Sequence, residues 1–385
     1  MNRPVVVIGG VIVGTAIAYE LQLADAPTIL VERDIEPQGA SAFSFASLSA
    51  FDEPHRDVYL LKTHGMIAWR HWAKVFGDEL GISFGGELRW AESKEAASHL
   101  TSLIERATSR GYPVRSISGE EVTKQEPASR PATASVACLA PDDGQADPVR
   151  AIDVLRGAFA DRGGTILVGR ASLMIEESGI TVRVGEERVA ASTVVVAAGA
   201  ETTALLERLG WEIPMDPSPG LLSVTERVEP FLKGTVYVYP QSDIPVHLRQ
   251  MSDGRVLVGE RAQDEIAKNP TREHARSLLR QARKSFPALE ATDVDHFTVE
   301  WRPMPRDGMP IVGPLPGLPS LYVATGHSGV TIAPALARFI TQEVVQGTEV
   351  DRLKPFRPAR FSAHGADAYR SIEDAFSGAS ELFIG

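Results

Sequence analysis

A glycine-rich turn near the N-terminus has the residue spacing of a phosphate-binding loop. Its sequence is Gly9-Gly10-Val11-Ile12-Val13-Gly14, between an apolar run at residues 4–8 and a helical pattern at residues 15–23. A second apolar run, at residues 28–31, ends in the acid Glu32. In units of this kind, the free N–H groups and the dipole of the helix N-terminus bind a pyrophosphate, and the acid binds ribose hydroxyls. The pattern predicts a strand–turn–helix–strand unit that binds a dinucleotide.

Val11 departs from this pattern. The fingerprint G-x-G-x-x-G has glycine at the second fixed position, where the backbone approaches the pyrophosphate closely. We expect a valine side chain there to push the phosphates away or to force the turn open. On this motif alone, a turn of the same shape that binds nothing remains an alternative.

Arg302 is the first candidate for binding an anionic substrate. Its planar guanidinium can hold a carboxylate through two parallel hydrogen bonds, which a lysine cannot imitate. The competing interpretation is a structural arginine paired with Glu300 or Asp307. His327 stands in a glycine-containing loop, where it could contact a ligand or only pack against the loop.

A second group of candidates lies in a segment rich in Val, Tyr and Leu. Side chains alternate between the two faces of a strand, so Tyr237 and Tyr239 share one face, as do His247 and Arg249. These four side chains could line a pocket, although ordinary sheet residues show the same alternation. The histidines of the chain are too scattered to predict a metal site.

The remaining periodicity supplies elements that could position these residues. Residues 216–260, with a turn at residues 241–243, predict a mainly antiparallel sheet. Further strands are predicted at residues 193–198 and 321–325, and helices at residues 55–80, 152–161, 272–286 and 329–346. The expected fold class is α/β, or α+β overall: a Rossmann-like domain interleaved with a mainly antiparallel-sheet substrate domain.

Length, charge and cysteine content restrict the class of protein. A chain of 385 residues is long enough for two domains. Its 39 Lys and Arg against 50 Asp and Glu give a net charge of -11, which argues against nucleic acid as a partner. The one cysteine, Cys138, excludes an intramolecular disulfide, and the apolar N-terminal run is too short to span a membrane. We therefore expect a cytoplasmic protein with no membrane span.

Four further segments carry a family resemblance. They are Gly39-Ala40-Ser41 with Ser44 and Ser47, residues 194–200 (VVVAAGA), residues 302–310 (RPMPRDGMP) and residues 326–331 (GHSGVT). In their order and spacing, the sequence resembles the flavin-dependent amine oxidoreductases of the D-amino-acid oxidase, glycine oxidase and sarcosine oxidase family. Residues 246–249 and 253–255 also look like the branch that contains opine oxidases and D-hydroxyproline dehydrogenases.

The resemblance implies non-covalent FAD and a domain division. It assigns residues 1–83, 142–215 and 300–355 to the FAD-binding domain, residues 84–141 and 216–299 to the substrate domain, and residues 356–385 to a tail. The cofactor-binding residues that it implies are Gly9, Gly10, Val11, Ile12, Val13, Gly14, Glu32, Arg33, Ala40, Ser41, Ser44, Ser47, Ala198, Gly199, Arg302, Gly326, His327, Gly329, Val330 and Thr331.

The resemblance also implies an activity. Such an enzyme oxidises the C–N bond of a D-amino acid or an N-substituted amino acid, of glycine, sarcosine or opine type, to an imine by hydride transfer to the flavin. The implied catalytic residues are Arg302, which aligns with the family's carboxylate-binding arginine, together with His327, Arg249, His247 and Tyr239. The helix after Gly329 is expected to direct its N-terminal dipole at the pyrimidine side of the flavin. Gly326 and Gly329 are expected to permit close approach of the backbone to the ring.

Residues 235–265 contain no lysine, although some oxidases of the family place one there to activate oxygen. This absence favours a dehydrogenase that passes electrons to an acceptor protein or a quinone. A homo- or hetero-oligomer is compatible with the sequence. Two other functions stay open: a non-catalytic or FAD-impaired homologue or subunit, because of Val11, and a flavoenzyme that oxidises a 2-hydroxy acid.

Overall fold

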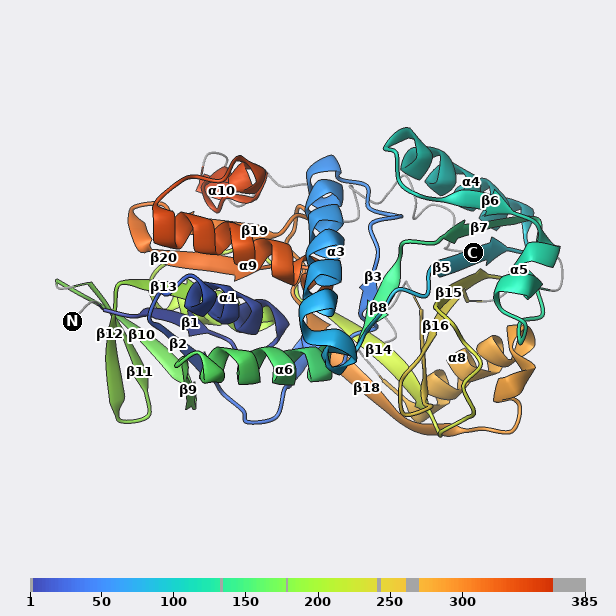
Figure 1. Ribbon diagram of the computed structural model, residues 1–385, viewed down its shortest axis with the longest axis horizontal. Coiled ribbons are helices and arrows are strands. Elements are labelled where there is room, and N and C mark those ends of the chain that lie inside the picture. Colours follow the sequence, from blue (N-terminus) through green and yellow to red (C-terminus); the bar gives the residue numbers. More distant parts are fainter. Residues whose placement is uncertain (1–2, 132–133, 178, 241–243, 261–269, 363–385) are drawn as a thin grey trace.

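The computed structural model describes residues 3–131, 134–177, 179–240, 244–260 and 270–362. Two large sheets lie on either side of α3 (Arg56–Phe76), which stands upright between them in Figure 1. The expected turn at residues 241–243 lies outside the described residues, as does the part of the tail from residue 363 onward.

The first sheet has six strands and is parallel except for one edge strand. Its order is β19 (Ile311–Leu315), β20 (Leu318–Thr325), β13 (Thr193–Val196), β1 (Val5–Ile8), β2 (Thr28–Glu32) and β9 (Thr165–Val168). Only β19 runs antiparallel to its neighbour. The Val side chains of its central strands β1 and β13 are buried on both faces, as expected for a parallel sheet that is covered on both sides.

Helices cover one face of this sheet and a small antiparallel sheet covers the other. The helices are α1 (Ile12–Leu23), α6 (Pro148–Asp161) and α9 (Gly329–Gln346), visible on the left of Figure 1. The small sheet consists of β10 (Ala171–Glu176), β11 (Gly179–Val184) and β12 (Glu187–Ala191). The predicted Rossmann-like arrangement is thereby confirmed.

The second sheet has eight strands and is mainly antiparallel. Its order is β18 (Val294–Arg302), β14 (Ser218–Thr225), β17 (Val256–Glu260), β16 (Val246–Gln250), β15 (Thr235–Tyr239), β5 (Glu87–Ala91), β7 (Val136–Ala140) and β6 (Arg115–Ile117). Only β15 and β5 pair in parallel. The predicted antiparallel sheet is thus confirmed and extended by β18 and by three strands from residues 87–140.

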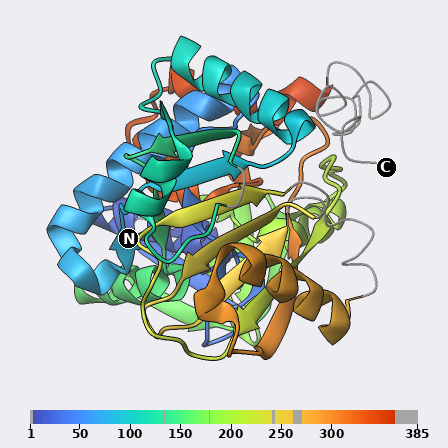
Figure 2. The same cartoon turned by 90° about the vertical axis from the view of Figure 1, so that its right-hand side faces the viewer.

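The two faces of the eight-stranded sheet differ in chemistry. Its apolar face includes Leu88, Trp90, Val236, Val238 and Leu248, and it packs against α8 (Arg272–Ser285). Figure 2 shows α8 lying across the outer side of the strands. The opposite face, which we call the polar face, carries Glu87, Arg89, Tyr237, His247 and Arg249 by strand alternation. The segment between β2 and β3 packs on this polar face, where Phe45 contacts Tyr237 and His247.

A three-stranded ribbon lies at the centre of the molecule, between the two large sheets (Figure 1). It consists of β3 (Ser47–Leu48), β8 (Gly144–Ala146) and β4 (Ile82–Ser83). The remaining α-helices are α2 (Gly39–Ala42), α4 (Lys94–Ser109), α5 (Gly119–Gln125), α7 (Thr202–Glu207) and α10 (Ala359–Ser362). Single 3₁₀ turns are η1 (Gly77–Leu80), η2 (Gly199–Glu201), η3 (Pro287–Leu289) and η4 (Asp351–Phe356).

The sequence prediction was wrong about several boundaries. The helix predicted at residues 55–80 ends at Phe76, because Gly77 takes a positive φ of 64° and the chain continues as a 3₁₀ turn. Strands β3, β4, β6, β7, β8, β10, β18 and β19 were not predicted. Strand β18 crosses the expected domain boundary at residue 300, because its pairing with β14 continues to Arg302. The division into two domains itself remains a prediction.

Candidate active site

The glycine loop is fixed by close packing of backbone on backbone. Gly9 has a φ of 103°, and a Cβ at this position would lie 2.4 Å from the carbonyl oxygen of Ala197 on the adjacent chain segment. A Cβ on Gly14 would lie 1.8 Å from the carbonyl oxygen of Gly9. Both positions therefore require glycine for the turn to close between β1 and α1.

Val11 does not force this turn open. It is the N-cap of α1 with φ -84° and ψ -165°, an extended conformation that any residue adopts. Its carbonyl oxygen accepts the Thr15 N–H at 2.9 Å, so the first helical turn is intact. Its side chain is half-buried against the apolar core. The expectation of a distorted turn is wrong, because the missing glycine was not needed for its backbone freedom.

Glu32 lies where the fingerprint requires an acid. Its Oε2 accepts the Gly10 N–H, and its Oε1 accepts the Arg33 N–H at 2.8 Å. Arg33 itself pairs with Asp34 and Glu201. The sequence analysis missed Arg156 of α6, whose Nη2 donates to the Gly10 carbonyl at 2.7 Å. Because Arg156 also donates to the carbonyl of Ile35, at 2.9 Å, it ties the loop to the segment after β2.

The N-terminus of α9 is held in place by α3. Pro334 lies inside α9 and has no N–H to donate to the Val330 carbonyl, four residues earlier. The indole N–H of Trp69 donates to that carbonyl instead, at 2.8 Å. Gly65 of α3 also approaches closely, since a Cβ there would lie 2.0 Å from the Thr331 carbonyl oxygen. The proline within the helix was the one usable signal in the sequence for the role of Trp69.

The loop before α9 and the first residue of that helix include three of the predicted site residues. Gly326 has a φ of 151°, and a Cβ there would lie 2.7 Å from Pro310. Gly329 faces Val13 of α1, at 3.3 Å from the Cβ position. The close approaches that the structure shows are thus to protein atoms. His327 is exposed, and its Nδ1 lies 3.1 Å from the Ser328 hydroxyl.

The small-residue segments lie beside this loop. The Thr331 hydroxyl donates to the Ser47 carbonyl at 2.9 Å, and the Ser44 hydroxyl donates to the Ser41 carbonyl at 3.0 Å. The carbonyl of Gly199, which follows Ala198, accepts the Thr325 hydroxyl at 3.1 Å. Helix α2, which contains Ala40, and the 3₁₀ turn η2 both contact β18. The structure therefore brings the predicted cofactor segments to the edge of the eight-stranded sheet.

His247 lies on the polar face, among aromatic rings. Its ring centroid is 4.3 Å from that of Phe45, in the loop after β2, and 5.3 Å from that of Tyr237. Gly259 on the neighbouring strand makes room for it, because a Cβ there would lie 2.4 Å from Nε2 of His247. Phe45 was missed as a site residue, although its loop was expected to lie along FAD.

Arg89 is the centre of a buried ion-pair cluster that the sequence analysis missed. It is 2% exposed, and its Nε and Nη2 both lie 2.7 Å from Oε1 of Glu87. Nη1 donates to the Tyr239 hydroxyl at 3.0 Å, and Asp52 lies 3.4 Å away. Tyr239, predicted as a catalytic residue, is thus a partner of Arg89 in this structure. The spacing Glu87-x-Arg89 on one strand face was an available signal.

A second buried acid adjoins this cluster. Asp143 is fully buried; its Oδ1 accepts the Tyr112 hydroxyl, and its Oδ2 has no hydrogen-bond partner among the described residues. Burial, and then the charge of Glu87, raise the pKa of Asp143 well above its ordinary value. Burial likewise raises the pKa of Glu87. Burial therefore opposes ionisation of both acids, while the charge of Arg89 favours it.

Arg302 and Arg249 lie on the same face as Arg89 but in different surroundings. The Nη2 of Arg302 donates to the Ser218 hydroxyl at 2.6 Å and to the Pro219 carbonyl at 3.1 Å. Asp307, one of its alternative partners, pairs with Arg360 at 2.7 Å instead. Arg249 is 5% exposed, and its side chain makes no hydrogen bond or ion pair with any described residue.

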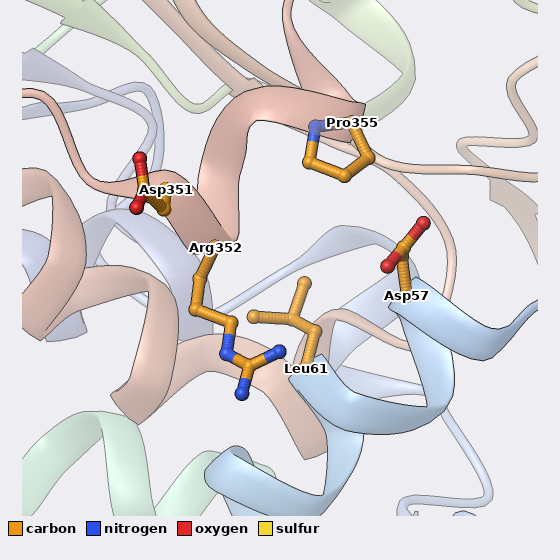
Figure 3. Close-up of a pocket in the computed structure, with 5 residues that line it drawn as sticks. All are labelled: Asp57, Leu61, Asp351, Arg352 and Pro355. Atoms are coloured by element: carbon orange, nitrogen blue, oxygen red, sulfur yellow. The ribbon is translucent and has the colours of Figure 1, made fainter.

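The pocket drawn in Figure 3 is separate from all these residues. It has a volume of about 370 Å³ and lies between the start of α3, with Asp57 and Leu61, and η4, with Asp351, Arg352 and Pro355. Within the described ranges, no group of three or more His, Cys, Asp or Glu is arranged to hold a metal. No helix in the same part of the chain is long and apolar enough to cross a membrane.

The family is decided by a match over most of the chain. Residues 4–343 match the family described as DAO, FAD dependent oxidoreductase. The chain belongs to the DAO family. The predicted resemblance is thus confirmed, and the protein is an FAD-dependent oxidoreductase.

Several relatives share nearly the whole length of this DAO-family chain. An opine oxidase component of Rhizobium meliloti is 24% identical over 94% of this chain and 98% of its own. Glycine oxidase of Bacillus subtilis is 28% identical over 93% and 97% of the two chains. The crystal structure of glycine oxidase from Geobacillus kaustophilus superposes with a TM-score of 0.83 at 23% identity, over 94% and 99% of the chains. This last similarity establishes the fold alone.

The residues of this DAO-family protein fit FAD. Helices α1 and α9 both begin without a side-chain cap, and their N-termini meet where Gly329 faces Val13. A Cβ on Gly39 or on Gly199 would meet nothing within 4 Å, so open space adjoins both small-residue segments. Glu32 completes the set as an acceptor for hydroxyl groups. The predicted cofactor residues remain a prediction, since each is assigned by position.

Proposed function

We propose that this enzyme oxidises the C–N bond of a D-amino acid or an N-substituted amino acid to an imine. The observation that carries the proposal is the polar face, which presents Arg302 and Arg249 toward the segments that fit FAD. The names of the relatives agree with it, because they include opine oxidase, glycine oxidase and, among solved structures, iminodiacetate oxidase of Chelativorans sp. BNC1.

Arg302 binds the substrate carboxylate in this proposal. Its Nε and Nη2 contact Ser218 and Pro219, and these contacts fix the plane of the guanidinium before the substrate binds. A fixed carboxylate in turn fixes the α-carbon to which it is attached. Such positioning is the main contribution of the protein when no proton has to be abstracted from carbon.

Bound FAD supplies the acceptor for the hydride. The C–H bond of the substrate breaks with both electrons, and the lone pair of the neutral amine forms the C=N bond. Water then converts the imine to an oxo acid and ammonia or a free amine. The N-terminus of α9, held by Trp69, would stabilise negative charge that develops beside it.

The first test is the visible spectrum of the purified protein, before and after denaturation. We expect a flavin spectrum, with the chromophore released on denaturation because its attachment is non-covalent. Anaerobic addition of amino acids should then bleach the flavin. In Arg302→Met, bleaching should require about 100-fold more substrate, because a charged hydrogen-bond pair is lost. Bleaching of Arg302→Met at the wild-type substrate concentration contradicts the proposed role of Arg302.

Two alternatives are separated by further measurements. If the protein were an FAD-impaired homologue, Val11→Gly should raise flavin occupancy strongly. We expect instead less than about a threefold change in FAD affinity, because the backbone at Val11 is unstrained.

If the protein were a 2-hydroxy acid oxidoreductase, lactate or glycolate should bleach the flavin, and no ammonia or amine should form. Release of ammonia or amine in proportion to the substrate consumed supports the amino acid reaction.

Partners and location are also proposals. Some relatives are named as subunits of opine oxidase, which favours a hetero-oligomer. The absence of lysine from residues 235–265 favours a separate electron acceptor, either a protein or a quinone, over oxygen. Flavin that is bleached by substrate and reoxidised faster by a quinone analogue than by air would support a dehydrogenase; a location in the cytoplasm would be tested by cell fractionation.

A further inference from the structure

Arg249 is a buried cation without a counter-ion among the described residues. It lies on β16, is 5% exposed, and has a buried Nε that makes no hydrogen bond. Proteins normally pair a buried charge, because an uncompensated one costs several kcal/mol. A buried guanidinium that has no anionic partner among the described residues can bind an anion from outside the chain.

The surroundings of Arg249 supply no competing anion within the described part of the chain. The charge that acts most on it is Asp147, but that carboxylate caps α6 by accepting the Arg150 N–H at 3.1 Å. Burial lowers the pKa of Arg249 to about 10, so the side chain is still cationic at neutral pH. On the adjacent strand β15, the register places Thr235 opposite Arg249, and the hydroxyl of Thr235 donates to Glu87.

Arg249 lies close to the segments that fit the cofactor. The main chain next to it is tied to β8, because the amide of Gln145 donates to the carbonyl of Gln250 at 3.3 Å. Gln145 pairs with Ser47 of β3, and the Ser47 carbonyl accepts the hydroxyl of Thr331 at the start of α9. A short chain of contacts thus leads from Arg249 to the predicted flavin-binding helix.

Arg249 and Arg302 are too far apart to hold the same carboxylate. Arg249 pairs in register with Leu257, Leu257 with Val224, and Arg302 with Ser218. Val224 and Ser218 are six residues apart on β14, and β16 is three strands away from β18. From ordinary sheet dimensions, the Cα atoms of the two arginines are roughly 25 Å apart. At this separation, the two guanidinium groups cannot meet on one carboxylate.

We propose that Arg249 binds a second carboxylate of the substrate, so that the enzyme acts on amines carrying two carboxylates. This inference rests on the proposed function, because Arg302 holds the carboxylate next to the oxidised carbon. The second carboxylate belongs either to a substituent on nitrogen or to the side chain of the amino acid. Arg249 recognises the same chemistry in both cases.

The test is a binding measurement that requires no turnover. Thiodiglycolate has two carboxylates about a sulfur atom, and (methylthio)acetate lacks the second carboxylate. Each is titrated into the flavin-loaded enzyme, and the change in the visible flavin spectrum gives its Kd. We expect the wild type to bind thiodiglycolate about 30-fold more tightly, and Arg249→Met to reduce this preference to less than about threefold. Arg249→Lys should recover part of it.

Two matched variants make the result specific. Arg302→Met should weaken both ligands, because it removes the contact that they share. Arg255→Met should leave the preference unchanged, because Arg255 lies just before β17 and pairs with Asp253. A preference for thiodiglycolate that persists in Arg249→Met, or a wild type without any preference, overturns the inference.

Anaerobic reduction separates this inference from the proposed function. Iminodiacetate carries its second carboxylate on nitrogen and D-glutamate carries it on the side chain, so the more efficient of the two identifies the source. If amines bleach the flavin but Arg249→Met affects sarcosine and iminodiacetate equally, the second anchor is wrong and the proposed function stands. If the ligand preference depends on Arg249 but no amine bleaches the flavin, C–N oxidation is wrong and the second anchor stands.

Discussion

Two arginines on the polar face, Arg89 and Arg249, are almost equally buried but differ in their surroundings. Arg89 is enclosed by Glu87, Asp52 and the Tyr239 hydroxyl, and its guanidinium stacks on the rings of Phe51 and Tyr237 at 4.5 Å and 4.1 Å. Arg249 makes no such contact within the part of the chain that the structure describes. The same residue type on the same sheet therefore has its charge compensated by the fold at one position only.

This difference separates stability from function. A compensated buried cation such as Arg89 belongs to the scaffold, because its partners replace the water that it lost. An uncompensated one such as Arg249 lowers stability until an anion arrives. Local costs of this kind are expected at binding sites, where the ligand supplies the missing partner. The predictions below test whether Arg89 and Arg249 differ in this way.

Arg89→Met should give the largest effect on stability. It leaves Glu87 buried without its cation, and breaking a buried pair on one side costs about 3–5 kcal/mol. We expect the apparent Tm to fall by roughly 4–6 °C in a thermal scan. Arg115→Met is the matched control, since Arg115 is exposed on β6 and its pair with Glu121 should contribute less than about 1 kcal/mol.

The double variant Glu87→Met/Arg89→Met sharpens this prediction. Because it removes both charges, it should recover much of the stability lost in Arg89→Met. If both single arginine variants, Arg89→Met and Arg249→Met, lowered Tm equally, the contrast between the two positions would be lost. If the losses of stability in Glu87→Met and Arg89→Met simply add in the double variant, the Glu87–Arg89 pair is not the source of the effect.

The sequence predicted the elements that local patterns encode. The glycine loop, its flanking strand and helix, and the antiparallel sheet of residues 216–260 each follow from residues that are neighbours in the chain. Alternation predicted that Tyr237 shares a face with Tyr239 and that His247 shares a face with Arg249. The register of β15 with β16 in the structure then places both pairs on the same face. Even the FAD-family segments were found by their order along the chain.

The sequence could not show which charges would meet. Arg89 and Arg249 are indistinguishable as alternating strand residues, and Asp52, an acid near Arg89, comes from a separate loop 37 residues away. Trp69 contacts the start of α9 across 261 residues. The effect of Val11 was also misjudged, because a missing glycine matters only where the backbone needs a positive φ or the space of a Cβ, and Val11 needs neither for the turn. Such contacts depend on how the two sheets are placed about α3.

Asp143→Asn should give a smaller effect that depends on pH. Folding raises the pKa of this buried acid, so the native state binds its proton more tightly than the unfolded state does. Its contribution to stability therefore falls as the pH rises above the ordinary value of 3.8. Asparagine resembles the protonated acid and carries no such loss. We expect the free energy of unfolding of Asp143→Asn to exceed that of the wild type at pH 8, and the difference to shrink progressively toward pH 4.

The matched control for this prediction is Asp142→Asn, because the side chain of Asp142 is 58% exposed. The Tm of this variant should follow that of the wild type at every pH. A difference between Asp143→Asn and wild type that is constant from pH 4 to pH 8 would contradict a titrating Asp143. A difference that grows toward low pH would do so as well.

Arg249→Met should give the smallest change in the ligand-free enzyme and the clearest contrast with Arg89→Met. Methionine fills a similar volume and removes a buried charge that has no partner among the described residues, so Tm should stay equal or rise by the equivalent of up to about 1 kcal/mol. Thiodiglycolate at 100 times its Kd should stabilise the wild type by about 2.7 kcal/mol. At the same concentration it should stabilise Arg249→Met by much less, because the second carboxylate of the ligand no longer meets the Arg249 guanidinium. A fall in Tm of ligand-free Arg249→Met as large as that of Arg89→Met would show that Arg249 belongs to the scaffold after all.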